Sequence, residues 1–225
     1  MNYAFQYNVV WPAWPELLSG AMLTFELGVL AFWGGALIGL VGAAIETYGA
    51  RPLRWLVDGY VTFFTNTPAL VQIFFLYFGL PEVGLRWSSY TCVLLGLTLN
   101  AGAYLTIIMR AGFLSVRRTE LEAGLTLGMS LVQLIRYVIV PHIAKTIYPA
   151  LANFFTVILI LGTPVGMVIG LNDLLGTAYS LSTVNYRFLE FLSVTAVIYV
   201  VIGLFGDVLL AAVGRWAFRV KTRVF

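Results

Sequence analysis

Several polar side chains stand inside long apolar stretches of the sequence, where they could contact a polar solute. Glu26 lies in the stretch 17–45, and a carboxylate is costly to keep in an apolar surrounding, so such a residue usually has a function. Thr67, Asn100 and Tyr104 are neutral and could line a path for the solute. All of them are also explained as hydrogen-bonding groups between helices. We therefore predict substrate-path candidates here and keep helix packing as the alternative.

Catalytic and metal-binding chemistry finds no support in the residue pattern. His142 is the single histidine and Cys92 the single cysteine, so neither a catalytic cluster nor a metal-ligand spacing is present. The phosphate-binding pattern G-x-x-x-x-G-K-[ST] is absent as well. We expect no enzyme activity, no metal and no cofactor on this chain, and any ATP with its Mg²⁺ must be bound by another polypeptide.

The composition indicates that a membrane surrounds these residues. The 225-residue chain is 60% hydrophobic and 10% charged, and its mean hydropathy is +0.92, whereas a soluble domain carries about 25% charged residues. A helical span needs roughly 20 apolar residues. Runs of that kind predict an all-α integral membrane protein of one domain, 1–225, with about five transmembrane helices. The predicted spans are 17–45, 55–80, 90–109, 138–161 and 188–213.

The basic residues predict the orientation of these spans. All of them except Arg86 and Arg187 follow the first span, surround the segment between the third and the fourth, or follow the fifth. By the positive-inside rule these regions are cytoplasmic, which places the N-terminus outside and the C-terminus inside. Glu190 is then expected to be solvated near the external interface. The basic residues form no stripe, so we expect membrane lipid and no nucleic acid as a partner.

The polar segment between the third and fourth spans carries a motif. Glu122-Ala123-Gly124 is followed by Gly128 and later by Val138-Ile139-Val140-Pro141, with apolar residues at helical spacing between them. We predict short amphipathic helices at a membrane surface. A glycine between them permits a sharp turn or a close approach, and a proline fits the entrance of the next helix. The pattern resembles the EAA loop of ABC-importer permeases, E-A-A-x-x-x-G followed by I-x-L-P, with modest changes at Gly124, Val138 and Val140.

Other stretches are similar to the polar amino acid uptake branch of that family. Its G-T-P-L-L-V-Q resembles Thr67-Pro68-Ala69-Leu70-Val71-Gln72, its F-x-Y-F-G-L-P resembles residues 75–81, and its P-A-L-x-N resembles residues 149–153. The resemblance implies the architecture of a type I ABC-importer permease, with a cytoplasmic coupling-helix loop at about 111–140. It also implies a permease subunit that moves an amino acid or a related small polar solute across a bacterial cytoplasmic (inner) membrane.

The same resemblance implies several partners. These are ABC ATPase subunits that hold ATP and Mg²⁺, a second permease subunit, and a periplasmic or extracellular solute-binding protein. Coupling to the ATPase is then expected at Glu122, Ala123, Gly124, Gly128 and Pro141. A subunit of an ion-gradient-driven secondary transporter or channel is the alternative, although the sequence shows no repeat that favours it.

Charged positions of the family are uncharged in this chain. The arginine of R-G-T-P is Thr65, the glutamate of A-Y-x-A-E is Ile107, and the charged K-D-T-S stretch reads Ile160-Leu161-Gly162-Thr163. A charge in lipid usually has a function, so losing several together indicates that the function is lost or moved. We predict a heterodimer with a permease subunit that keeps the charged substrate contacts. A homodimer for a less polar substrate is the rival prediction.

Overall fold

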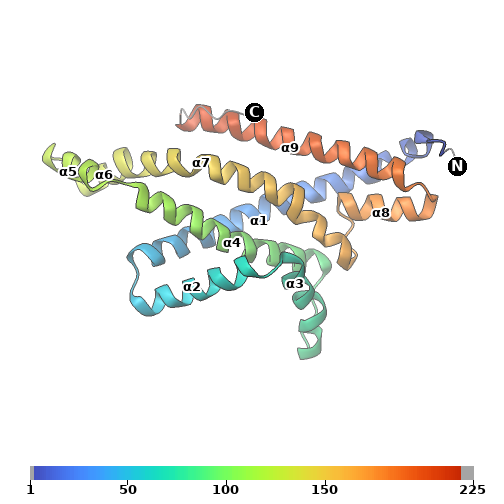
Figure 1. The fold of residues 1–225 in the computed structure, drawn as a ribbon, viewed down its shortest axis with the longest axis horizontal. Helices are drawn as coiled ribbons and strands as arrows, with labels where there is room; N and C mark the ends of the chain where they lie inside the picture. Colours follow the sequence, from blue (N-terminus) through green and yellow to red (C-terminus); the bar gives the residue numbers. More distant parts are fainter. Residues whose placement is uncertain (1–2, 219–225) are drawn as a thin grey trace. The chain divides into compact units, whose positions relative to one another are not determined.

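The computed structural model describes residues 3–218, and these residues form helices and connecting turns without a strand (Figure 1). The basic residues Arg219, Lys221 and Arg223, which contributed to the predicted orientation, lie outside the described residues. The α-helices are α1 (Trp14–Tyr48), α2 (Arg51–Asn66), α3 (Ala69–Phe74), α4 (Ser89–Ser115), α5 (Arg118–Thr126), α6 (Leu131–Leu134), α7 (Val140–Val157), α8 (Leu174–Asn185) and α9 (Phe188–Phe218). Short 3₁₀-helices cover Tyr7–Val9, Trp11–Ala13, Leu80–Val83 and Thr163–Ile169.

Four helical stretches of the described chain are long and apolar enough to cross a membrane. They are Tyr7–Tyr48, Ser89–Ser115, Leu131–Ile169 and Phe188–Ala212. A fifth span exists only if the broken pair Arg51–Asn66 and Ala69–Val83 is counted as one. The prediction of a continuous second span over 55–80 is wrong in this respect, because Pro68 lacks an N–H donor and disfavours a helical conformation at Thr67. The fourth span also begins earlier than predicted, at Leu131.

Prolines explain the other local departures from α-helix. Each π-helical turn ends two residues before a proline: Phe75–Gly79 before Pro81, Ile135–Ile139 before Pro141, and Ile158–Gly162 before Pro164. The middle residue of each turn is therefore four positions before the proline, and its carbonyl is the one that loses its N–H partner and would contact the ring. A wider turn moves that carbonyl aside within a continuous helix.

The chain divides into two compact units, each assembled from three separate stretches. The first unit comprises Met1–Trp33, Thr67–Thr98 and Phe155–Gly206, and the second comprises Gly34–Asn66, Leu99–Phe154 and Asp207–Phe225. The single domain expected over 1–225 stays a prediction.

The first unit has its hydrophobic core where the start of α1 packs against α8 and α9. The buried residues of this core are Val10, Ala13, Leu17, Ala21, Leu174, Ala178 and Phe191. Asp173 caps α8, since its carboxylate accepts the Gly176 N–H at 2.8 Å. The Thr24 hydroxyl of α1 accepts the Leu174 N–H at 3.0 Å. Two donors that a helix start leaves unpaired are thereby satisfied inside the core.

In the second unit, glycines allow α1 to approach α4 closely. A methyl group added at Gly39 would lie 2.7 Å from the Leu105 Cβ, and one added at Gly42 would lie 2.5 Å from the Thr106 Oγ1. Contacts that short would force the neighbouring helix to shift, so both positions favour glycine. Such close backbone approach is a common way to pack helices in a membrane.

Candidate coupling element and polar helix contacts

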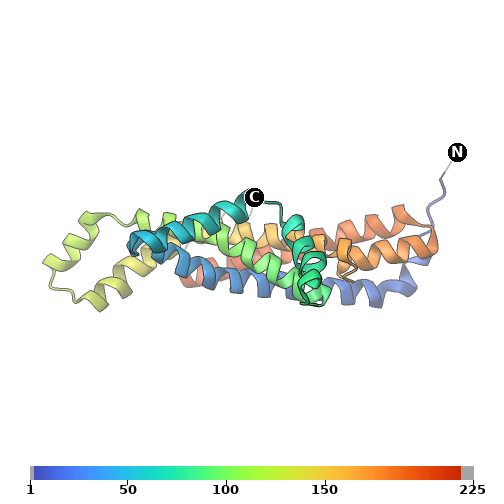
Figure 2. The ribbon, with the colours of Figure 1, turned by 90° about the horizontal axis from the view of Figure 1, so that it is seen from below.

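Helices α5 and α6 form the connection between α4 and α7 in the second unit (Figure 2). We call residues 118–134 the α5–α6 tip. The turn inside it is a helix C-cap in which Gly128 has a φ of +75°. The Met129 N–H donates to the Gly124 carbonyl at 3.1 Å, and the Gly128 N–H donates to the Leu125 carbonyl at 2.9 Å. This pair of bonds is the Schellman arrangement, which favours glycine at the left-handed position.

The two glycines of the motif have different surroundings. A methyl group added at Gly128 would meet no atom within 4 Å, whereas one added at Gly124 would lie 2.4 Å from the Leu134 Cδ1. Gly128 is therefore needed for its backbone conformation, whereas at Gly124 a methyl group would require the end of the Leu134 side chain to shift. A capping box starts α6: the Ser130 Oγ accepts the Gln133 N–H at 3.3 Å, and the Gln133 Oε1 accepts the Ser130 N–H at 2.8 Å.

The outer surface of the α5–α6 tip carries charged and large apolar side chains. Glu122 and Ala123 are exposed. Large apolar side chains are exposed around them, with Leu127 at 81%, Val132 at 72% and Leu131 at 69% of their areas. Contiguous exposed apolar groups are typical of a surface that a partner covers.

A polar contact ties the tip to α7. The Glu120 Oε2, in the first turn of α5, lies 3.2 Å from the His142 Nδ1 near the start of α7. The sequence predicts Pro141 at the entrance of the next helix, and Pro141 is the second residue of α7. A π turn, Ile135–Ile139, joins α7 to α6 in one helical run that begins at Leu131. The tip is therefore continuous with the helix that follows it.

Asn100 and Tyr104 contact the end of α2 in the second unit. Asn100 Nδ2 donates to the Phe64 carbonyl at 3.1 Å, and the Tyr104 hydroxyl donates to the Thr65 carbonyl at 3.4 Å. The last carbonyls of α2 lack intrahelical partners because the helix stops before Pro68. Both side chains lie one turn apart on α4, and they satisfy those carbonyls. Helix packing therefore accounts for the contacts that these two substrate-path candidates make here.

Glu26 and Thr67 belong to the first unit. The Glu26 Oε1 accepts the Tyr90 hydroxyl at 2.7 Å, which links α1 to the start of α4. Glu26 also lines an otherwise apolar cavity of about 360 Å³ formed by α1 and α9. The Thr67 carbonyl accepts the Gln72 Nε2 at 2.8 Å. The Glu26 bond thus joins two helices of its unit, whereas the Thr67 bond is a local contact of its backbone at the start of α3.

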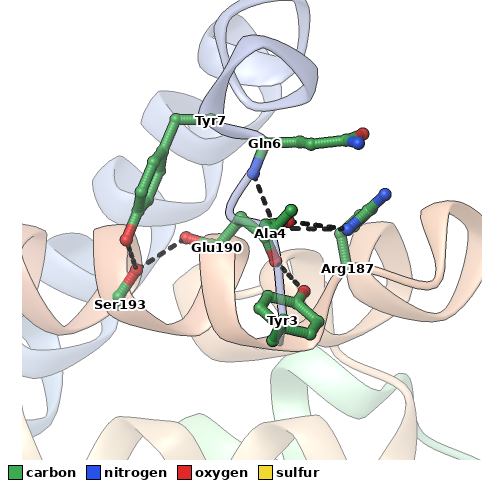
Figure 3. A network of polar contacts seen from close by, with 7 residues as sticks. All are labelled: Tyr3, Ala4, Gln6, Tyr7, Arg187, Glu190 and Ser193. Atoms are coloured by element: carbon green, nitrogen blue, oxygen red, sulfur yellow. Dashed lines mark hydrogen bonds and ion pairs between the residues drawn. The ribbon is translucent and has the colours of Figure 1, made fainter. Parts of the chain in front are cut away.

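Glu190 is fully buried, and the expectation that it is solvated is wrong. Its side chain has 0% exposure, because the N-terminal segment lies over the start of α9 (Figure 3). The Tyr3 hydroxyl donates to Glu190 Oε2 at 2.5 Å, the Gln6 N–H donates to Oε1 at 2.9 Å, and Arg187 Nη1 lies 3.6 Å from Oε1. Arg187 also donates to the Ala4 carbonyl at 3.3 Å. Glu190 therefore anchors the N-terminal segment to α9.

Sequence reasoning missed an ion pair in the second unit. Arg110 Nη1 lies 3.0 Å from the Glu46 Oε2, and the Glu46 side chain is only 4% exposed. The two residues are far apart in the sequence, and no local pattern couples them. Their places at the ends of the first and third predicted spans, on the same predicted side of the membrane, were the available signal.

Metal chemistry finds no geometric support in the part of the chain that the structure describes. Among residues 3–218, no group of three or more His, Cys, Asp or Glu side chains is arranged to hold a metal ion.

The chain is similar over most of its length to known transport proteins. The family described as "Binding-protein-dependent transport system inner membrane component" matches residues 35–219. The glutamine transport system permease protein GlnP of Escherichia coli K12 is 35% identical over 89% of this chain and 92% of its own length. The arginine transport system permease protein ArtQ of Bacillus subtilis 168 is 30% identical over 90% of this chain and 91% of its own.

Solved structures share the fold. A chain from the crystal structure of an amino acid ABC transporter with histidines is 33% identical, with a TM-score of 0.86 over 95% of this chain and 100% of that one. A chain of the MetNI methionine ABC transporter in an inward-facing conformation has a TM-score of 0.69 at 18% identity, over 90% of this chain and 98% of that one. The second likeness concerns the fold alone.

Proposed function

Because this chain belongs to the binding-protein-dependent transport system inner membrane components and is the permease subunit of an amino acid ABC importer, we propose that its α5–α6 tip couples it to the ATPase. The chain is not itself an enzyme. ATP and Mg²⁺ are bound by the ATPase subunits, and closure of those subunits moves the tip.

The exposed apolar side chains of the tip are the observation that carries this proposal. Leu127, Leu131 and Val132 are each more than two-thirds exposed, and a groove of the ATPase would cover them as a helix-in-groove contact. Glu122 lies exposed on the same element and supplies a charge that fixes the orientation of docking.

The internal contacts of the tip make it suited to transmit a movement. Gly124 lets Leu134 pack against α5, and Glu120 contacts His142 at the start of α7. A displacement of the tip therefore reaches α7 without a flexible joint. The nucleotide-bound ATPase then favours one pore conformation through its differential contacts with the tip.

Substrate-stimulated ATP hydrolysis by the reconstituted transporter tests this role. We expect Glu122→Gln to reduce stimulated hydrolysis and uptake by about tenfold, the effect of losing one central interface contact. The matched control is Glu82→Gln, since Glu82 is also exposed but lies outside the tip. Unchanged hydrolysis and uptake in Glu122→Gln would show that the carboxylate has no part in coupling.

We further propose that the solute is an amino acid of the polar class, delivered by an external solute-binding protein. The relatives support this, since GlnP is a glutamine transport system permease protein and ArtQ an arginine transport system permease protein. Glu26, Thr67, Asn100 and Tyr104 are the candidates of this chain for contacts along the path. Binding of labelled glutamine and arginine to the reconstituted transporter, with and without Glu26→Gln, tests the substrate class and the carboxylate together.

A second, different permease subunit is the proposed pore partner. At the positions where the family has charges, Thr65 donates its hydroxyl to the Val61 carbonyl of its own helix at 2.7 Å, and Ile107 is 49% exposed. Neither residue offers a charge to an ionic substrate, so the partner subunit would supply that charge. Mass spectrometry of the purified transporter decides this: two unlike permease chains are expected, and two copies of this chain would refute the heterodimer.

The chain is a multi-pass inner membrane protein, and we propose that its N-terminus is outside and its C-terminus in the cytoplasm. The basic residues around the α5–α6 tip support this orientation. In a Cys92→Ser background, a cysteine at Leu127 should react with a membrane-impermeant maleimide only in inside-out vesicles. Labelling in right-side-out vesicles would reverse the orientation.

A further inference from the structure

We propose that the second unit binds a phospholipid with an anionic headgroup between the end of α1 and the start of α2. Two cavities lie along these two helices, one polar and one apolar. The polar cavity has a volume of about 260 Å³ and is lined by Glu46, Arg51, Arg54, Trp55, Asp58 and Arg110. This site lies at the end of a candidate span, and the assigned transport activity does not use it.

The polar cavity carries an excess of positive charge. Arg110 is neutralised by Glu46 at 3.0 Å. In the part of the chain that the structure describes, Arg51 and Arg54 form no ion pair, and Asp58, the other acid of the cavity, interacts with Glu46. One positive charge is therefore left over, which matches a headgroup with one net negative charge. Arginine also offers several N–H donors that suit a phosphate.

The apolar cavity continues from the polar one along the same two helices. It has a volume of about 400 Å³, and its lining residues are Leu37, Ile38, Val41, Gly42, Ile45, Val57 and Tyr60. Gly42 of the apolar cavity and Glu46 of the polar one are one turn apart on the same face of α1, and Val57 and Arg54 are one turn apart on α2, so the two cavities follow one another along both helices. From Leu37 to Ile45 the groove extends about 12 Å along α1, given a rise of about 1.5 Å per residue.

A polar head followed by an apolar groove distinguishes a lipid from a free phosphate ion. Inorganic phosphate would need only the arginines, and it gives no account of the apolar groove. Leu37 and Val41 are 69% and 59% exposed, and an acyl chain would cover them. Arg51 lies 5.3 Å from the Trp55 ring centroid, and tryptophan with arginine at a span end is a typical interfacial pair. Basic pockets between helices on the cytoplasmic side of a membrane, where the proposed orientation places this site, bind lipid headgroups.

Native mass spectrometry of the complete transporter, delipidated and then titrated with phosphatidylglycerol, tests the head of the site. We expect Arg51→Gln with Arg54→Gln to weaken retention of the lipid about 30-fold, since each basic residue contributes about 1 kcal/mol. Arg54→Gln alone should show a partial loss. Arg86→Gln is the matched control for Arg54→Gln, because Arg86 is an exposed arginine outside the cavity. This variant should retain phosphatidylglycerol as well as the natural protein does. Equal retention in all variants would overturn the proposal.

The tail of the site is tested by filling the groove and by identifying what covers it. Val41→Trp should displace phosphatidylglycerol while binding of inorganic phosphate stays unchanged. If instead inorganic phosphate competes fully with the lipid and Val41→Trp has no effect, the site takes free phosphate and the lipid proposal is wrong. A photoreactive benzoylphenylalanine at Leu37 should form a lipid adduct. An adduct with a protein would show that a subunit covers the groove and would also overturn the proposal.

Discussion

The start of α9 and the α5–α6 tip differ in which groups they enclose. At α9, Glu190 is 0% exposed and has hydrogen bonds from Tyr3 and Gln6. At the tip, Leu127 is 81% and Val132 72% exposed. An enclosed charge with all its partners stabilises its own unit, whereas apolar groups left in the open on a charged segment between two spans are available to a partner. In this chain, function is therefore to be sought where packing is incomplete rather than wherever polar groups gather.

The largest stability effect is expected at Glu190. Glu190→Ala leaves Arg187 without its carboxylate and the Gln6 N–H without its acceptor, so it should lower the free energy of unfolding by several times the change in an exposed control. A denaturant titration in detergent measures the free energy of unfolding. Glu82→Ala, at an exposed position, should change it by less than about 0.5 kcal/mol. If both variants unfold alike, Glu190 does not anchor the N-terminal segment.

Asp173 should give a pH-dependent effect of intermediate size. Burial raises the pKa of this carboxyl to about 6 from an ordinary value of 3.8, with a smaller opposite effect of the Gly176 N–H. One carboxylate oxygen has no hydrogen-bond partner among the described residues. Since the folded state holds the proton more tightly, the stabilisation is complete below about pH 4 and is lost as the pH rises through about 6.

Asp173→Asn keeps the helix cap and removes this titration. At about pH 8 the free energy of unfolding of the variant should therefore be higher than that of the natural protein by up to about 3 kcal/mol. This difference should shrink as the pH is lowered to about 4. Thermal unfolding across that pH range provides the measurement. A constant difference between the two proteins at all pH values would mean that Asp173 does not titrate in this range.

A smaller effect is expected at the turn of the tip. Gly128→Ala forces a side chain into a left-handed conformation and should cost about 1 kcal/mol. Gly59→Ala is the matched control, because Gly59 lies within α2 with no atom near its added methyl group and no positive φ. That change should stabilise the protein by about 0.4–1 kcal/mol. The two alanine variants should thus move the unfolding free energy in opposite directions, and a shift in the same direction would contradict the role given to the turn.

Much of the architecture and the function was predictable from the sequence. The apolar runs located the spans, and the motif around Glu122 with the stretch from Thr67 to Gln72 pointed to an amino acid ABC importer permease, which the family and its relatives confirm. Family membership also decides against the ion-gradient-driven alternative. These features are local, so a single sequence displays them.

The features that escaped prediction depend on contacts between distant residues. Glu190 is buried only because a segment more than 180 residues earlier in the chain folds over it. The Glu46–Arg110 pair likewise joins two helices whose register no local pattern reveals. The hydrogen bonds of Asn100 and Tyr104 to α2 have two causes. The helix break at Pro68 could be predicted from the sequence, whereas the packing of α4 against the end of α2 could not.

The most direct test of the coupling role compares two exposed valines in the reconstituted transporter. Val132 in the tip and Val184 in α8 are 72% and 74% exposed, so serine at either position should change stability by no more than about 0.5 kcal/mol. We predict that Val132→Ser lowers substrate-stimulated ATP hydrolysis and that Val184→Ser leaves it at the level of the natural protein. Equal hydrolysis in the two variants would contradict the assignment of the α5–α6 tip as the coupling element.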